Sequence, residues 1–147
     1  MALETDTKRR MHHICDCLVY HGEDPGLRDR IVNVLSLLPD DVTDFALDRC
    51  AFLSVGKASA GMVLPGRIGV HGHEKRSRNF WLVLLDENMP GDDSVIAHEI
   101  AHAWLRHDRL AADDCETWER DAADLARSWG FVGRGTDVEF CEGPYRR

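Results

Sequence analysis

The apolar and polar residues of this chain alternate with a period that changes from segment to segment. Between positions 24 and 38 the apolar residues recur three or four positions apart, which predicts a helix with one buried face. Asp24 is suited to cap that helix, Pro25 to occupy its first position, and Pro39 to end it. A shorter helical segment is expected behind it, over residues 40–46.

Runs of β-branched and aromatic residues predict strands in the middle of the chain. Residues 50–55 form one such run, and residues 67–71 form a shorter one. Residues 80–85 are the most apolar run and are therefore expected at the centre of the sheet. We expect a turn at Pro65-Gly66 and a polar hairpin loop over residues 71–78.

Two further helices are predicted after these strands. The first covers residues 95–107 and contains the pattern H-E-x-x-H. The second covers residues 115–129 and is ended by Gly130. One strip of the second helix carries mostly small side chains, which let another helix approach closely; its residues are Glu119, Ala122, Ala123 and Ala126. The mixture of helices and strands predicts an α+β fold.

The length of 147 residues fits a single domain over 1–147 with an ordinary hydrophobic core. The first ten residues are polar and charged, so we expect a frayed end over 1–10. Residues 131–147 are expected to form a C-terminal surface tail. We see no internal repeat that would divide the chain.

Charge and cysteine content narrow the class of protein. The formal net charge of −8, from 26 acidic and 18 basic residues, argues against nucleic acid as a partner. The longest wholly apolar run, residues 81–85, is far too short to span a membrane. Five cysteines without a disulfide-like spacing favour a reducing, cytoplasmic location. Cys15 and Cys17 stand in a C-x-C spacing that suits a structural zinc site poorly.

The H-E-x-x-H pattern is typical of a zinc site. His98 and His102 lie four positions apart and share one face of a helix, where two neutral imidazoles can chelate one Zn²⁺. Glu99 is turned about 100° away, beside the metal, where its carboxylate can take a proton from water. The strip of small residues around Glu119 is a place where a third ligand could meet the two histidines.

His98-Glu99-x-x-His102 followed by Glu119-x-x-Ala122 resembles the gluzincin pattern. Within that group, residues 98–107 are similar to the ImmA/IrrE-type zinc peptidases, and the resemblance covers residues 80–129. It implies a zincin-like α+β fold, with a small twisted sheet, a zinc helix on one face and an edge strand that holds an extended peptide. It also implies Glu119 as the third ligand, ranked before Asp108 and Glu116. Many gluzincins place Asp at the position of Ala123, where it orients a ligating histidine.

These patterns predict a zinc metallopeptidase that hydrolyses a peptide bond of a protein or peptide substrate. Zinc would be held by His98, His102 and Glu119, with Glu99 as general base. The alternative is a zinc-binding sensor or protein-interaction module on the same fold with little hydrolysis; the presence of Glu99 favours the enzyme. His71, His73 and Tyr145 are weaker candidates for contacts with a substrate.

Overall fold

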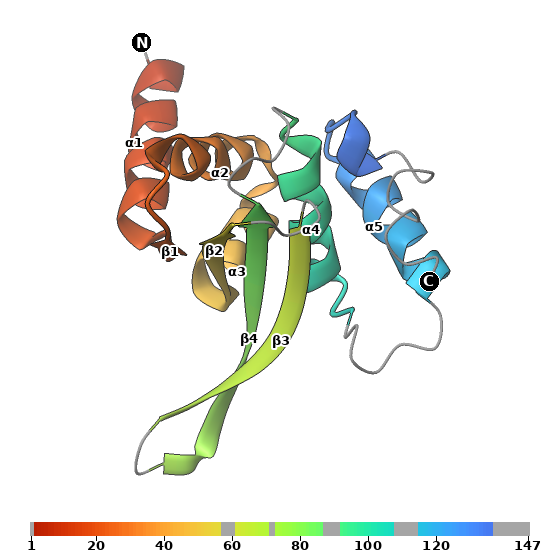
Figure 1. Cartoon of the computed structure of the whole chain (residues 1–147). Coiled ribbons are helices and arrows are strands. Elements are labelled where there is room, and N and C mark those ends of the chain that lie inside the picture. Colours follow the sequence, from red (N-terminus) through yellow and green to blue (C-terminus); the bar gives the residue numbers. More distant parts are fainter. Residues whose placement is uncertain (1, 57–60, 71–72, 87–91, 108–114, 137–147) are drawn as a thin grey trace.

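The computed structural model of the chain describes residues 2–56, 61–70, 73–86, 92–107 and 115–136 (Figure 1). Within these residues it has five α-helices, four β-strands and one short 3₁₀ helix, so the chain is an α+β protein, as predicted. The elements are, in order, α1 (Ala2–Cys17), β1 (Tyr20–His21), α2 (Pro25–Leu37), α3 (Asp40–Arg49), β2 (Cys50–Val55), β3 (Gly61–Val70), β4 (His73–Asp86), α4 (Ser94–Trp104), α5 (Cys115–Ser128) and η1 (Arg134–Thr136).

The strands form one sheet with the order β1-β2-β4-β3. β1 and β2 pair in parallel, β2 and β4 pair in parallel, and β3 is antiparallel to β4 at one edge. The predicted strand 50–55 is confirmed as β2. Residues 80–85 lie in β4, and from Trp81 onward they have a neighbouring strand on each side, as their apolar character predicted. Val83 and Leu85 are completely buried.

Two predictions for the β3–β4 region were wrong. Pro65-Gly66 is not a turn, because Pro65 pairs with Trp81 inside β3. Proline is tolerated there because β3 is an edge strand among the described residues. The hairpin loop is also shorter than predicted, since β4 begins at His73; residues 71–72 lie outside the described residues.

The β3–β4 pair is longer than the rest of the sheet. β2 begins its pairing with β4 at Cys50↔Trp81, so the part of β4 from His73 to Phe80 pairs with β3 alone. Figure 1 shows this two-stranded ribbon extending away from the helices. The opposite end of β3, at Gly61, lies against Glu99 of α4.

Helices α2, α3 and α4 pack with the sheet around one core. Asp24 caps α2 as predicted, because its side chain accepts a hydrogen bond of 2.8 Å from the backbone N–H of Gly26. The core combines fully buried side chains of α2, the sheet and α4, namely Ile31, Leu35, Phe52, Val63, Val83, Leu85, Ile96 and Ile100. α4 is therefore a central element and not a surface helix.

Both ends of the described chain contain helical residues that contact the rest of the domain. The expected frayed segment belongs to α1, which Ile14 anchors in the core. Arg10 adds a 2.7 Å hydrogen bond to the Leu38 carbonyl and a 2.5 Å ion pair with Asp40. At the other end, Gly135 and Thr136 are buried in η1, so the first residues of the expected tail pack onto the domain. Residues 137–147 lie outside the described residues.

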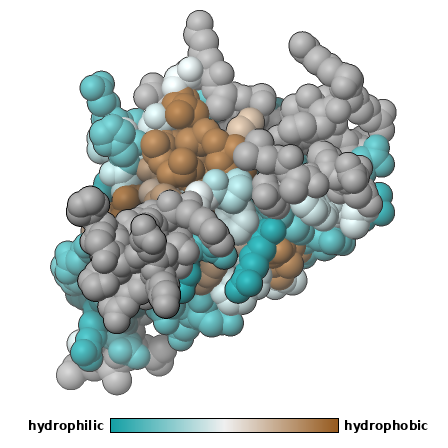
Figure 2. All heavy atoms as spheres, turned by 90° about the horizontal axis from the view of Figure 1, so that it is seen from below, coloured by the Kyte–Doolittle hydropathy of each residue, from teal (hydrophilic) through white to brown (hydrophobic). Residues whose placement is uncertain are grey.

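The surface of the described residues is mixed in polarity. Figure 2 shows, on the face seen from below, apolar side chains gathered in separate areas with polar side chains between them. The large apolar side chains that are exposed are Val19, Leu37, Met62, Leu105 and Val132. No helix within the described ranges is long and apolar enough to cross a membrane.

Candidate metal centre

α4 positions the two histidines of the H-E-x-x-H pattern. All residues from Ser94 to Ala103 are buried, because the helix is enclosed by the sheet, α2, α3 and α5. His98 is 3% exposed and His102 is fully buried. Both candidate ligands on α4 are therefore covered by the elements around the helix.

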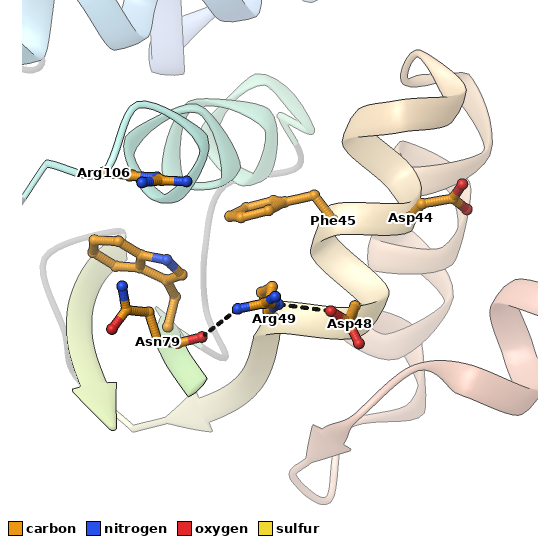
Figure 3. Close-up of a pocket in the computed structure, with 7 residues that line it drawn as sticks. Asp44, Phe45, Asp48, Arg49, Asn79 and Arg106 are labelled. Atoms are coloured by element: carbon orange, nitrogen blue, oxygen red, sulfur yellow. Dashed lines mark hydrogen bonds and ion pairs between the residues drawn. The ribbon is translucent and has the colours of Figure 1, made fainter. Parts of the chain in front are cut away.

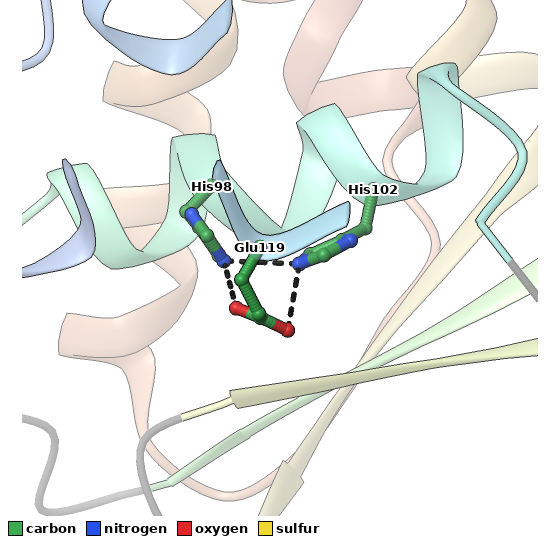
Figure 4. A group of neighbouring side chains, drawn as sticks. All are labelled: His98, His102 and Glu119. Carbon is green, nitrogen blue, oxygen red and sulfur yellow. Dashed lines mark hydrogen bonds and ion pairs between the residues drawn. The ribbon is translucent and has the colours of Figure 1, made fainter. Parts of the chain in front are cut away.

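The imidazoles of His98 and His102 and the carboxylate of Glu119 converge on one point (Figure 4). The two Nε2 atoms are 3.0 Å apart. Oε2 of Glu119 lies 3.0 Å from Nε2 of His98, and its Oε1 lies 3.3 Å from Nε2 of His102. Among the described residues this is the group of three or more His, Cys, Asp or Glu side chains that could hold a metal ion.

The spacing of these ligand atoms fits a tetrahedral ion. Zinc–nitrogen and zinc–oxygen bonds of about 2.0–2.1 Å place neighbouring ligand atoms of a tetrahedron about 3.3 Å apart. The separations of 3.0 to 3.3 Å are close to that edge length. Two histidines and one glutamate are also a ligand set that catalytic zinc sites use, with the fourth position left for water or substrate.

Charge at the centre favours a bound cation. Glu99 and Glu119 are only 4% and 5% exposed, and they share the centre with two imidazoles. Buried carboxylates are costly unless paired with positive charge or a metal ion. A divalent cation between the histidines and Glu119 would balance both carboxylates.

Glu119 reaches the centre because α5 approaches α4 closely. The α5 residues Ala122, Ala123 and Ala126 are completely buried, and their small side chains permit the approach that the sequence predicted. The structure therefore brings together Glu119 and the two histidines. Glu116 is exposed and is not part of the group, and Asp108 lies outside the described residues.

Glu99 lies beside the ligand group, against the start of β3. A Cβ atom built on Gly61 would come within 2.7 Å of Cγ and 2.8 Å of Oε1 of Glu99. The absence of a side chain at position 61 thus leaves the space that the Glu99 carboxylate occupies. Glycine at the first residue of β3 lets the strand pass directly over the candidate base.

His107 belongs to the centre, and the sequence analysis missed it. Its Nδ1 atom lies 2.9 Å from Nδ1 of His102, on the opposite side of that ring from the ligand group. The His107 ring also stacks on the indole of Trp118, with centroids 4.9 Å apart and planes 8° from parallel. The available signal was a third histidine, at the end of the helix predicted over residues 95–107.

The first turn of α4 is held by residues from the far end of the described chain. The Asp92 carboxylate accepts from the backbone N–H of Ser94 at 2.9 Å and from that of Arg134. The Ser94 hydroxyl accepts from the N–H of Gly135 at 2.8 Å. Burial acts to raise the pKa of Asp92, but hydrogen bonds from Ser94 and Arg134 and the charge of Arg30 outweigh it, and the pKa is lowered.

Cys15 and Cys17 do not belong to this ligand group. Cys17 is exposed and its Sγ is 3.6 Å from Nδ1 of His13, while Cys15 is half-buried. His73 begins β4, and His71 and Tyr145 lie outside the described residues.

A separate cavity of about 470 Å³ lies between α3, the end of α4 and β4 (Figure 3). It is lined by Asp44, Phe45, Asp48, Arg49, Asn79, Trp81 and Arg106. There the guanidinium of Arg49 donates hydrogen bonds to the Asp48 carboxylate, at 2.6 Å, and to the Asn79 backbone carbonyl, at 3.5 Å. None of the three candidate metal ligands lines this cavity.

Fold and site together define an α+β protein with a buried His-His-Glu group that can hold a metal ion. Comparison of the chain with protein-family models, with curated proteins and with solved structures found no match. The functional assignment therefore rests on the residues and geometry of the centre.

Proposed function

We propose that this chain is a zinc-dependent peptidase with a zincin-like arrangement of sheet and helices. The observation that carries the proposal is the convergence of His98, His102 and Glu119, with atoms 3.0–3.3 Å apart, beside the buried carboxylate of Glu99. A purely structural zinc site is usually closed by a fourth Cys or His and needs no carboxylate base next to it.

The proposed roles follow from chemistry at each atom. Nε2 of His98, Nε2 of His102 and the Glu119 carboxylate would hold the ion. A zinc ion in such a site lowers the pKa of a water ligand to about 7 and polarises a carbonyl group. Glu99 accepts a proton from the attacking water and delivers it to the departing amine nitrogen, which cannot leave as an anion.

The sheet offers a place for an extended polypeptide. β3 is the edge strand among the described residues, and its first residue, Gly61, contacts Glu99. An edge strand presents backbone N–H and C=O groups that can pair with an added strand. We propose that the substrate lies along β3 so that its scissile bond reaches the centre.

A second candidate function is supported by the burial of the centre. His98, Glu99, His102 and Glu119 are each at most 5% exposed. A zinc-binding sensor or protein-interaction module would keep such a centre covered, whereas a peptidase must admit its substrate. The two functions differ in whether the zinc-loaded protein cleaves polypeptides.

The test is digestion of a mixed peptide library by zinc-loaded protein, followed by mass spectrometry. We expect the wild type to cleave, and Glu99→Gln to retain stoichiometric zinc but to lose cleavage, because the amide keeps the size and cannot accept the proton. Glu116→Gln is the matched control, since Glu116 is an exposed glutamate, and it should cleave like the wild type. Undiminished cleavage by Glu99→Gln would remove the proposed base, and zinc binding without any cleavage by the wild type would favour the second candidate.

A further inference from the structure

The end of α4 is a turn that places His107 against His102. Arg106 adopts a left-handed conformation, with φ of 59°. Its N–H bonds to the Ala103 carbonyl at 3.1 Å, and the N–H of His107 bonds to the His102 carbonyl at 3.0 Å. This pair of bonds is a Schellman motif, which usually has glycine at the left-handed position. His107 is thereby fixed to the backbone of a candidate ligand residue.

The side chain of His107 makes a second contact with the same residue. Its Nδ1 lies 2.9 Å from Nδ1 of His102, and His107 as a whole is 7% exposed. Two facing Nδ1 atoms at this distance require that one donates and the other accepts. The ring of His107 therefore selects which nitrogen of His102 carries the proton.

The ligand geometry decides the direction of this hydrogen bond. Nε2 of His102 faces His98 and Glu119, so it must keep its lone pair to bind an ion. A neutral imidazole then carries its proton on Nδ1, and His102 donates from Nδ1 to Nδ1 of His107. His107 in turn carries its proton on Nε2.

The ring of His107 is held from the other side by α5. It stacks on Trp118, which directly precedes Glu119 in the sequence. One side chain is thus in contact with a candidate ligand on α4 and with the neighbour of a candidate ligand on α5. Its position depends on both helices that form the centre.

We infer that His107 is a positioning residue of the metal centre, which accepts the Nδ1 proton of His102 and aligns its Nε2 with Glu119. This inference rests on the proposed metal site and deepens it. Ligating histidines almost always donate their second N–H to an orienting partner, and loss of that partner typically costs 10–100-fold in metal affinity. A neighbouring imidazole takes the orienting role at His102.

The test compares two substitutions that separate the hydrogen bond from the stacking. His107→Asn keeps an acceptor oxygen near the position of Nδ1 and loses the stacked ring. His107→Phe keeps a ring to stack on Trp118 and loses the acceptor. The measurement is zinc affinity by competition with a chelator of known affinity, and thermal unfolding of the zinc-free proteins reports on folding. His12→Phe is the matched control, because His12 is an exposed histidine on α1.

We expect zinc affinity to fall about 10–100-fold in His107→Phe and to stay within about threefold of the wild type in His107→Asn and His12→Phe. Wild-type affinity in folded His107→Phe would overturn the inference while leaving the metal site intact. Failure of the wild type to bind zinc would instead overturn both the proposed function and this inference.

A measurement on the unsubstituted protein covers the case in which His107→Phe does not fold. Nitrogen-15 NMR of the zinc-loaded wild type should show a protonated Nδ1 in His102 and an unprotonated Nδ1 in His107. The opposite tautomer of His107, with its proton on Nδ1, would overturn the inference. Neither readout depends on peptidase activity.

Discussion

Gly61 and Glu99 meet so closely that position 61 has no room for a side chain. A Cβ atom there would lie 2.7, 2.9 and 2.8 Å from Cγ, Cδ and Oε1 of Glu99. Real Cβ atoms do not approach other heavy atoms this closely, so any larger residue must displace the carboxylate or the strand. The position of the Glu99 carboxylate therefore depends on the glycine at position 61 of β3.

We predict that Gly61→Ala lowers kcat about 10–100-fold and leaves zinc content unchanged. The methyl group would push the Glu99 carboxylate away from the attacking water, and a displacement of about 1 Å can cost about 100-fold in rate. Steady-state kinetics and metal analysis measure the two quantities. Gly66→Ala is the control on the same strand, since a Cβ at position 66 meets nothing nearer than 3.7 Å. Equal loss of activity in both variants would point to the strand and not to Glu99.

A second prediction concerns Glu119. Glu119→Ala should lower zinc affinity by at least about 100-fold, because it removes one of three protein ligands and leaves only the two histidines. Chelator competition measures the affinity. Glu116→Ala removes an exposed glutamate three positions earlier on α5 and should change affinity by less than about threefold. Tight zinc binding by Glu119→Ala would show that the third ligand lies elsewhere, with Asp108 the next candidate.

A third prediction concerns the strained turn after α4. Arg106 holds a φ of 59°, a conformation that costs a non-glycine residue about 1–2 kcal/mol. Glycine relieves this strain but loses more backbone entropy on folding, so Arg106→Gly should stabilise the protein by about 0.5–1 kcal/mol. Chemical denaturation of the zinc-free protein measures the change. A decrease in stability would mean that the Arg106 side chain contributes more than its backbone strain costs.

A fourth prediction is a loss of stability in acid through Asp92. Its pKa is lowered in the folded protein, so folding favours the ionised form. This contribution is complete above the ordinary pKa of 3.8 and is lost as pH falls through the lowered folded-state pKa. Asp92→Asn should therefore be less stable than the wild type at neutral pH, with a difference that shrinks below about pH 4. Unfolding experiments at several pH values measure this, and a difference independent of pH would contradict the role of the charge.

Sequence patterns predicted the elements whose signals are local. The capped helix after Asp24, the apolar strand at residues 80–85 and the helix with small residues around Glu119 are present as expected. Local spacing also placed His98 and His102 on one face. The approach of Glu119 to them followed from the alanines of α5, which are visible in the sequence.

The features that were missed depend on contacts between distant segments. Pro65-Gly66 has the composition of a turn, but pairing with β4 keeps it extended. His107 becomes part of the centre only through the left-handed turn at Arg106 and the stacking on Trp118. The three-residue η1 is too short to produce a periodic pattern.

The attachment of η1 to α4 sets an order of events during synthesis. Asp92 and Ser94 receive hydrogen bonds from Arg134 and Gly135, which are translated about forty residues later. Gly135 also packs against the Ser94 backbone so closely that a Cβ there would overlap it. When His98 and His102 have just emerged from the ribosome, Glu119 and the segment that secures the start of their helix have not yet emerged. The three candidate ligands could therefore hold a metal ion together only after nearly all of the described chain has emerged.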